Sequence, residues 1–518
     1  MENIPNVRKI GNEFFGQGRP CVKLRLIVLK SMENLAELWT TRSGEDNEEF
    51  LIPNLHYLSV SNCPKLKFLP YPPRSMFWPL ENIDEIISEG GFGKLSSSAL
   101  SFKMAINNCS FSLDNWDRLH HFPTLESFQV ESCNSLRALP EDIRCFTSLK
   151  NLVLKSLKEL ESLPKWLGCL ISLQRVFIED CPKITSFPES MKNQTALKVL
   201  LLKRCKGWEI LPEWIGQLTS LQKFQIIDCP NLTSLPESMK DLSSLTKLYI
   251  KECQGLAMLP ECLGQLITLQ DISIINCPNL TTLPESMKGL TSLTRLYIKE
   301  CQGLAMLPEC LGQMISLQKI HIIDCPNLIS LPESMKSLSS LAKLYIKECQ
   351  GLAMLPECLG QLITLQDISI INCPNLTTLP ESMKGLTSLP ELYIKECQGL
   401  AMLPECLGQM ISLQKFHIID CPNLTSLPES MKSLTSLRLL WLKDCQGLHV
   451  LPEWLQELIS LEELNIIRCC NLTSLRESIQ HLTALKELCI WGCPILVERC
   501  QGEDAGLISH IPEVSLHL

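Results

Sequence analysis

Residues 245–268 read LTKLYIKECQGLAMLPECLGQLIT, and residues 269–292 read LQDISIINCPNLTTLPESMKGLTS. Both follow one 24-residue pattern, L-x-x-L-x-L-x-x-C-x-x-L-x-x-L-P-x-x-φ-x-x-L-x-x, where φ is apolar. We number its positions as slots 1 to 24. Sixteen consecutive units, the first starting at Leu125 and the last at Leu485, keep this frame without insertion or deletion. A fixed period of this length is typical of a solenoid of stacked units.

The spacing within a unit predicts its local structure. Slots 4 and 6 are two residues apart, so they point to one face of an extended strand, while slots 3, 5 and 7 point to the other face. The proline in slot 16 suits the first turn of a short helix or 3-10 segment. One unit cannot bury enough apolar surface to offset the entropy of ordering its chain, so stacking has to supply the rest.

The unit resembles the leucine-rich repeat, with Cys where Asn often stands. This resemblance implies an α/β leucine-rich repeat solenoid, or horseshoe. A parallel β-sheet is expected on the concave face, and short helical, 3-10 and loop segments on the convex face. We predict three parts: irregular N-terminal repeats with insertion loops at 1–124, the regular sixteen-unit array at 125–492, and a C-terminal cap at 493–518.

Part of the array is copied almost without change. The stretch LYIKECQGLAMLPECLGQ occurs at 248–265, 296–313, 344–361 and 392–409, and residues 249–328 differ from 345–424 at three positions. This identity indicates a recent duplication of a four-unit block. The alternating strand sequences in the block would then form a periodic surface.

The 27 cysteines follow the same frame. Seventeen occupy slot 9, and four more, Cys262, Cys310, Cys358 and Cys406, lie in slot 18. Zinc sites need close pairs such as C-x-x-C, which this chain lacks. We therefore interpret the cysteines as a structural ladder of small buried groups in a reducing compartment, rather than as metal or redox sites.

Composition and charge exclude several classes of function. The net charge of −9 provides no basic surface for nucleic acid. No apolar run is long enough to span a membrane, and the N-terminal residues do not resemble a secretory signal. No catalytic constellation, cofactor-binding motif, nucleotide site or metal site is recognisable. We expect a cytoplasmic, non-enzymatic protein that binds no cofactor.

The chain also resembles the leucine-rich repeat region of plant intracellular nucleotide-binding disease-resistance proteins. Three features carry this resemblance: CPNL or CPKL from slot 9 onward, the L-P-E-x-φ return segment, and a closing C-P-x-L-x-x-R-C followed by G-E-D and H-I-P. The closing motif comprises Cys493, Pro494, Leu496, Arg499, Cys500, Gly502, Glu503, Asp504, His510, Ile511 and Pro512. Ala505 stands where the family usually has Trp. The family's nucleotide-binding and N-terminal signalling domains are absent, so the resemblance implies the recognition part, binding a pathogen effector or a guarded host protein.

The concave face is the expected protein-binding surface, because its slots 5 and 7 carry aromatic, lysine and isoleucine side chains. The candidate residues are Arg175, Phe177, Glu179, Leu201, Lys203, Tyr249, Lys251, Tyr297, Lys299, Tyr345, Lys347, Tyr393, Lys395, Trp441, Lys443 and Trp491. The opposing interpretation is that duplication merely propagated one strand sequence. Specific recognition is expected to depend on Phe177, Trp441 and Trp491, outside the copied block.

Alternative functions built on the same repeats remain open. They are a signalling scaffold or adaptor without an immune role, a substrate-recognition subunit of a ubiquitin ligase, and a proteinaceous enzyme inhibitor. No ligase-docking motif is readable in residues 1–60.

Overall fold

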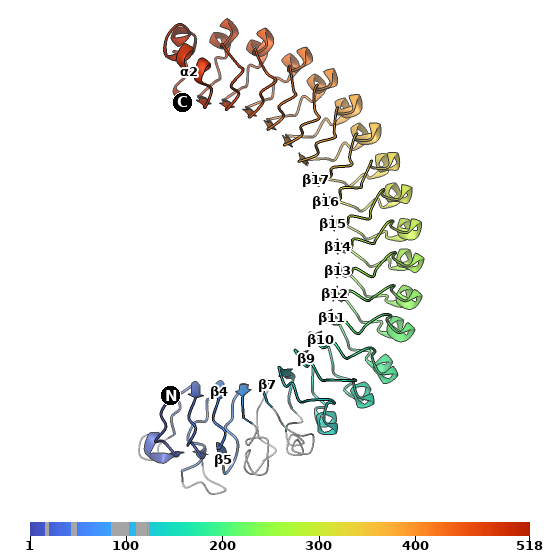
Figure 1. The fold of residues 1–518 in the computed structure, drawn as a ribbon, viewed down its shortest axis with the longest axis vertical. Coiled ribbons are helices and arrows are strands. Elements are labelled where there is room, and N and C mark those ends of the chain that lie inside the picture. The colour runs from blue at the N-terminus through green and yellow to red at the C-terminus, as the bar shows by residue number, and fades with distance from the viewer. Residues whose placement is uncertain (16–19, 43–48, 84–102, 110–121, 123) are drawn as a thin grey trace. The chain divides into compact units, whose positions relative to one another are not determined.

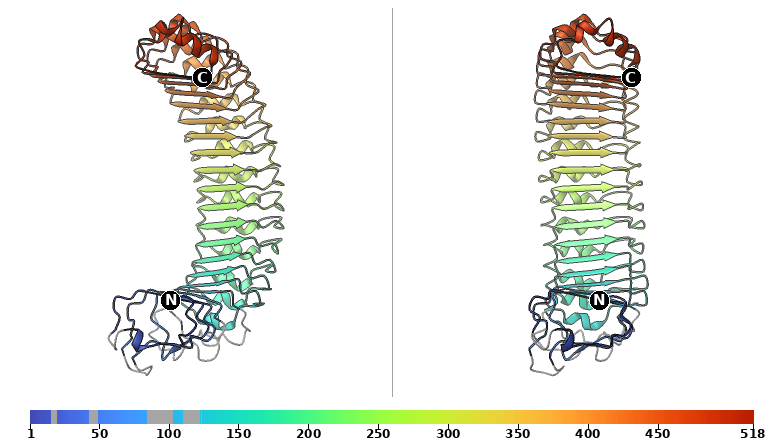
Figure 2. Two further views of the ribbon diagram at one scale, coloured as in Figure 1. Left: turned by 60° about the vertical axis from the view of Figure 1, so that its left-hand side comes forward. Right: turned by 90° about the vertical axis from the view of Figure 1, so that its left-hand side faces the viewer.

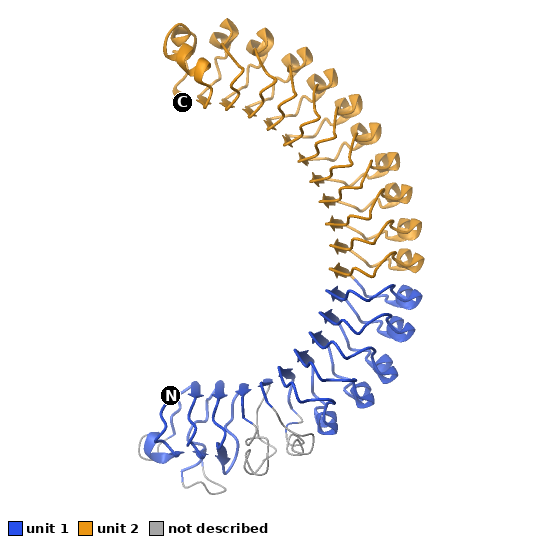
Figure 3. Cartoon of the chain, viewed as in Figure 1, with its two compact units in different colours: residues 1–245 blue, residues 246–518 orange. Residues whose placement is uncertain are grey.

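The computed structural model describes residues 1–518 except 16–19, 43–48, 84–102, 110–121 and 123 (Figure 1). Within each stretch of the array, successive 24-residue units lie side by side as rungs, each with one strand on one side and one 3-10 helix on the other (Figure 2). The chain divides into two compact units, residues 1–245 and 246–518 (Figure 3). The part of the predicted insertion that falls within 84–100 lies outside the described residues.

Unit 1 contains two parallel sheets. In the larger sheet each strand pairs with the next in the order β2, β4, β6, β7, β8, β9, β10, β11, β12; the smaller sheet has the order β1, β3, β5. The strands are β1 Lys9–Ile10, β2 Leu26–Lys30, β3 Glu37–Trp39, β4 Tyr57–Ser61, β5 Lys67–Leu69, β6 Phe77–Glu81, β7 Lys103–Asn107, β8 Ser127–Glu131, β9 Asn151–Lys155, β10 Arg175–Glu179, β11 Val199–Lys203 and β12 Lys223–Ile227. The 3-10 helices are η1 Asn12–Phe14, η4 Glu141–Cys145, η5 Lys165–Cys169, η6 Glu189–Asn193, η7 Glu213–Gln217 and η8 Glu237–Asp241.

Unit 2 has one parallel sheet, in which consecutive strands from β13 to β24 pair. Its strands are β13 Lys247–Lys251, β14 Asp271–Ile275, β15 Arg295–Lys299, β16 Lys319–Ile323, β17 Lys343–Lys347, β18 Asp367–Ile371, β19 Glu391–Lys395, β20 Lys415–Ile419, β21 Leu439–Lys443, β22 Glu463–Ile467, β23 Glu487–Trp491 and β24 Glu513–His517. Its 3-10 helices are η9 Glu261–Gln265, η10 Glu285–Gly289, η11 Glu309–Gln313, η12 Glu333–Ser337, η13 Glu357–Gln361, η14 Glu381–Gly385, η15 Glu405–Gln409, η16 Glu429–Ser433, η17 Glu453–Glu457 and η18 Glu477–His481. Two α-helices, α2 Pro494–Gln501 and α3 Ala505–Ile508, lie in the predicted cap.

The core of each rung is the apolar pattern itself. In the rung that starts at Leu245, the side chains in slots 1, 4, 6, 9, 12, 15, 19 and 22 are all buried. The strand register is 24 residues, as in Tyr249 opposite Ser273, so each buried slot stacks on its equivalent in the next rung. Slots 3, 5 and 7 form the opposite side of the sheet, which we call the solvent face.

Slot 8 turns the chain through the left-handed region after each strand from β10 to β22. From Asp180 to Arg468 the φ angle at this slot is 50–57°, although none of these residues is glycine. Asp and Asn tolerate this conformation better than most residues, and they fill about half of these slots. The backbone N–H of slot 8 donates a hydrogen bond to the slot-7 carbonyl of the next rung, as Glu252 does to Ile275 at 2.8 Å.

The glutamate in slot 17 caps the 3-10 helix of the following rung. The carboxylate of Glu309 accepts a hydrogen bond from the backbone N–H of Ser334 at 3.3 Å, and Glu333 accepts from Glu357 and Cys358 at 2.9 Å. The same contact joins Glu213 to Ser238, Glu261 to Ser286, Glu285 to Cys310, Glu357 to Ser382 and Glu405 to Ser430. The N–H groups that a helix start leaves without partners are thus satisfied from the neighbouring rung.

Alternate rungs are complementary in shape, which gives the 48-residue repeat a structural role. In the PECLGQ rungs slot 20 is glycine, and a Cβ on Gly312 would lie 1.9 Å from the carbonyl oxygen of Ser334 in the next rung. In the turn after the strand, Asn327 donates to the Gln302 carbonyl at 2.7 Å, and Gly351 of the following rung lies against the Pro326 carbonyl. Two kinds of rung therefore alternate because each fits the other.

Candidate interaction surface

The candidate binding residues of unit 2 all lie on the solvent face. Tyr249, Tyr297, Tyr345, Tyr393 and Trp441 occupy slot 5 of β13, β15, β17, β19 and β21, and their side chains are half-buried. The lysines of slot 7 lie two residues further along the same strands. Trp491, at the end of β23, is 52% exposed.

Aromatic side chains on this face form two stacked triplets. His321 lies between Tyr297 and Tyr345, with ring centroids 5.7 and 5.6 Å apart in edge-to-face geometry. His417 lies between Tyr393 and Trp441 at 5.4 and 6.0 Å. Aromatic pairs at these separations attract one another beyond their area of contact.

Between the triplets, β18 carries Ser369 in slot 5, and its hydroxyl bonds Asp367 at 3.0 Å. The sequence analysis named the Tyr and Trp residues as candidates but not their grouping around His321 and His417, which the order of slot-5 residues in successive rungs encodes.

Three polar atoms in the triplets are buried and have no hydrogen-bond partner within the described part of the chain. They are Nε2 of His321, Nε2 of His417, which lies 3.5 Å from Oε1 of Glu391, and Nε1 of Trp441. Burial lowers the pKa of both histidines, which favours neutral imidazole rings. The indole nitrogen and both imidazole nitrogens therefore lie beneath the surface of the solvent face.

The slot-7 lysines of the copied rungs are paired within their own rungs. Lys251, Lys299, Lys347 and Lys395 lie 2.8–3.1 Å from the slot-8 glutamates that follow them. The hydrogen bond to its glutamate raises the pKa of each lysine. The copied surface is therefore a row of ion pairs and not a row of free cations.

The slot-7 isoleucines are not fully exposed on the solvent face. Ile275, Ile323, Ile371 and Ile419 are half-buried, and Ile467 is 7% exposed. In register, each pairs with the slot-7 residues of the neighbouring strands, as Ile275 does with Lys251 and Lys299. Slot 7 of the copied rungs therefore alternates isoleucine with the lysines of the ion pairs.

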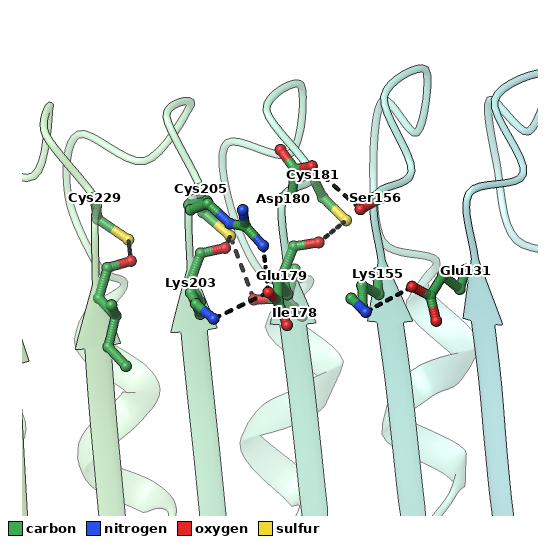
Figure 4. Close-up of polar contacts among 12 residues, drawn as sticks. Glu131, Lys155, Ser156, Ile178, Glu179, Asp180, Cys181, Lys203, Cys205 and Cys229 are labelled. Carbon is green, nitrogen blue, oxygen red and sulfur yellow. Dashed lines mark hydrogen bonds and ion pairs between the residues drawn. The ribbon is translucent and has the colours of Figure 1, made fainter.

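Unit 1 holds Arg175, Phe177 and Glu179 on β10 and Leu201 and Lys203 on β11. Glu179 and Lys203 are drawn in Figure 4. Phe177 and Leu201 pair directly across the two strands and are half-buried. Partial burial raises the pKa of the Glu179 carboxyl, but hydrogen bonds from Lys203 and Arg204 outweigh it and hold the pKa below its usual value. Another ion pair joins the two preceding strands, where Lys155 of β9 lies 2.6 Å from Glu131 of β8.

Comparison with known proteins bears on the architecture. A family model described as a leucine-rich repeat region matches residues 103–254. A leucine-rich repeat protein of Leptospira interrogans is similar in structure, with 21% identity and a TM-score of 0.51, covering 80% of this chain and 90% of that chain. TLR13 in its complex with ssRNA13 has 16% identity and a TM-score of 0.62, covering 100% of this chain and 73% of that one. No curated protein matches the sequence.

The fold is a leucine-rich repeat solenoid. The likeness to the solved structures lies below 25% identity, so it concerns the fold alone. Such solenoids are generally non-enzymatic scaffolds for protein interaction, with the binding surface spread over many repeats. The prediction of the fold class from the 24-residue pattern is confirmed.

The closing motif of the leucine-rich repeat solenoid forms a local ion-pair cluster. Arg499 in α2 donates through Nε and one terminal nitrogen to both carboxylate oxygens of Asp504, at 3.1 Å each, and Asp504 is 5% exposed. Glu503 lies 3.1 Å from another nitrogen of Arg499. A bidentate arginine–carboxylate pair is among the stronger polar contacts, so these motif residues stabilise the cap.

The slot-9 cysteines of the solenoid act as hydrogen-bonding core groups. Cys301 donates to the Lys299 carbonyl of its own rung at 3.4 Å and to the Ile274 carbonyl of the preceding rung at 3.9 Å (Cys205 in Figure 4 shows the same pattern). Cys310, Cys358 and Cys406 in slot 18 are also buried and donate to proline carbonyls of the preceding rung. All 27 cysteines are free thiols. Burial raises the pKa of Cys277, Cys349 and Cys397 to about 11.

Two kinds of site are absent from the described residues. No group of three or more His, Cys, Asp or Glu side chains there is arranged to hold a metal ion. None of the helices described has the length and apolar character needed to cross a membrane.

Proposed function

We propose that this chain is a non-enzymatic recognition module of the plant disease-resistance type, which binds a pathogen protein or a guarded host protein on the solvent face. The observation that carries the proposal is the aromatic triplet Tyr393–His417–Trp441 on the solvent face. A half-buried tryptophan packed against a histidine ring is the kind of group that forms an interface hot spot. The closing motif supports the disease-resistance type through its resemblance to that family.

The free thiols support a cytoplasmic location for this module. Each slot-9 thiol hydrogen-bonds to backbone carbonyls in the core, and a reducing compartment keeps such thiols from oxidation. Imaging of a fluorescent fusion in plant cells tests this location; a secreted or vacuolar signal contradicts it.

Affinity capture tests the binding function. The chain is immobilised and exposed to extracts of infected and uninfected plant tissue, and retained proteins are quantified by mass spectrometry. A specific partner should be lost with Trp441→Ala, which we expect to cost about 2 kcal/mol, or roughly thirtyfold in Kd. The same partner should persist with Tyr249→Ala, a copied tyrosine outside both triplets.

The controls decide between the two interpretations of the solvent face. Phe177→Ala and Trp491→Ala should also weaken binding more than Tyr249→Ala does. Equal losses for all four variants, or losses only at copied tyrosines, would contradict a binding surface outside the copied rungs. A partner retained only from infected tissue, or one that infection modifies, distinguishes a defence role from a general scaffold.

A further inference from the structure

One hollow of unit 2 lies away from the solvent face. It is a groove of about 950 Å³ on the side of the unit, where slots 14–17 lead from the turns to the 3-10 helices. Its lining comes from seven successive rungs, from Glu285 to Pro428. The Leu-Pro pairs of slots 15 and 16 are buried and form its floor.

Exposed methionines recur along this groove. Met306, Met354 and Met402 in slot 14 are 58%, 61% and 61% exposed. The rungs between them carry Ser330, Thr378 and Ser426 in the same slot. Methionine is a flexible, polarisable side chain that adapts well to a binding surface. The groove thus offers an apolar contact on every second rung.

The charged lining of the groove has one sign. Its ionisable residues are Glu285, Glu309, Glu333, Glu357, Glu381 and Glu405, and no lysine or arginine lines it. Hydrogen bonds to backbone N–H groups of the next rung hold several of these carboxylates in place, mostly through one oxygen. The carboxylates therefore form a fixed negative row beside the methionines, and they require a cationic occupant.

The spacing of the methionines indicates which backbone conformation the occupant would have. Met306 and Ser330 pair as an isolated parallel bridge, so adjacent rungs lie at about the normal strand separation of ~4.8 Å here. Methionines two rungs apart are then about 9.6 Å apart. A polyproline II helix repeats every three residues, or about 9.3 Å. Equivalent side chains of a β-strand repeat at about 6.7 Å, which does not match.

We propose that this groove binds a basic, proline-rich segment of a partner protein in the polyproline II conformation. One edge of the segment presents Lys or Arg to the glutamate row. The other two edges place proline rings between the methionines and on the Leu-Pro floor. The groove spans about six rung steps, or about 29 Å, which corresponds to about nine residues at 3.1 Å each.

Three fluorescein-labelled peptides test the proposal by anisotropy: (Pro-Pro-Arg)₃, (Gly-Ser-Arg)₃ with the same charge but no proline, and (Pro-Pro-Glu)₃ with the opposite charge. The full chain should bind (Pro-Pro-Arg)₃ more tightly than (Gly-Ser-Arg)₃, and should not bind (Pro-Pro-Glu)₃. Equal affinity for the two arginine peptides, or no binding of (Pro-Pro-Arg)₃, overturns the proposal.

Matched variants locate the site. The triple variant Met306→Ser, Met354→Ser and Met402→Ser gives these rungs a small hydroxyl residue in slot 14, as the alternate rungs already have. It should weaken the binding of (Pro-Pro-Arg)₃ by about tenfold or more. Glu309→Gln, Glu357→Gln and Glu405→Gln keep the acceptors that cap the helices but remove charge, and should also weaken binding.

The control is Ile315→Thr, Ile363→Thr and Ile411→Thr, which changes equally exposed side chains in slot 23 of the same rungs. This variant should bind as the unchanged chain does, and circular dichroism confirms that all variants are folded. Unchanged affinity in the methionine variant, or an equal loss in the isoleucine variant, overturns the assignment. Trp441→Ala should leave peptide affinity unchanged, so this test stands apart from that of the solvent face.

Discussion

Replacing Gly312 by alanine tests the complementarity of alternating rungs. The added Cβ would lie 1.9 Å from the carbonyl oxygen of Ser334 and 2.5 Å from its carbonyl carbon, both backbone atoms that cannot rotate away. Overpacking of this kind costs about 1–3 kcal/mol, while the Gly→Ala change itself recovers about 0.4–1 kcal/mol by restricting the unfolded chain. We expect the free energy of unfolding to fall by about 1–2 kcal/mol.

The measurement combines urea unfolding with hydrogen exchange, because a long repeat array need not unfold in one step. Exchange should accelerate in peptides covering η11 and η12. The control is Lys336→Ala, in slot 20 of the next rung, where the side chain is exposed and the change should stay within about 0.5 kcal/mol. If Gly312→Ala were neutral or stabilising, the 48-residue repeat would reflect duplication alone, and our explanation of the alternation would be wrong.

Two further predictions concern the turns and the thiols. Asn276→Val should lower the free energy of unfolding by about 1–2 kcal/mol because a β-branched residue is strained at φ 50°, whereas Asn276→Gly should stay close to the unchanged chain; equal urea midpoints for the two variants would contradict this. The buried thiols should make stability fall above pH 9. A thiol ionises near 9.0 in the unfolded chain and near 11 in the folded one, so its contribution is complete below pH 9 and is lost as pH rises toward 11, by at most about 1.4 kcal/mol per pH unit for each thiol. Urea midpoints that stay constant from pH 8 to 10.5 would contradict a buried, protonated ladder.

The sequence pattern was sufficient for the strands, the 3-10 helices and the buried slots, because the constraints that place them lie within one unit. The contacts between units were not predictable in the same way. Glu309 is visible as part of L-P-E, but its partner Ser334 is 25 residues away, and nothing local relates the two. The left-handed turn in slot 8 was also missed, because Glu252 and Arg204 give no sign of it. The recurrence of Asp and Asn in this slot, as at Asp228 and Asn276, was the available signal.

The sequence predicted which face of the sheet carries the candidate residues. It did not predict the contacts that these side chains make with one another. Alternation along each strand placed Tyr249 and Trp441 on the solvent side. Whether a lysine there is free depends on slot 8, where the left-handed turn brings Glu252 to Lys251 at 3.0 Å. The groove beside the Leu-Pro row was not predicted. In the sequence, Met306 in slot 14 looks like any other apolar residue of the repeat, and nothing indicates that it is exposed. Its exposure follows from the packing of the turn, which the periodic pattern does not describe.

The glutamate in slot 17 also gives the array a direction. The carboxylates of Glu261, Glu285, Glu309, Glu333 and Glu357 all accept hydrogen bonds from the helix of the following rung. A ribosome releases the rungs in this same order, so the acceptor for each new helix is already folded when that helix emerges. When rungs fold from the N-terminus toward the C-terminus, each new 3-10 helix meets a glutamate acceptor that is already in place. Folding in the opposite direction would leave each new helix uncapped until the next rung had formed.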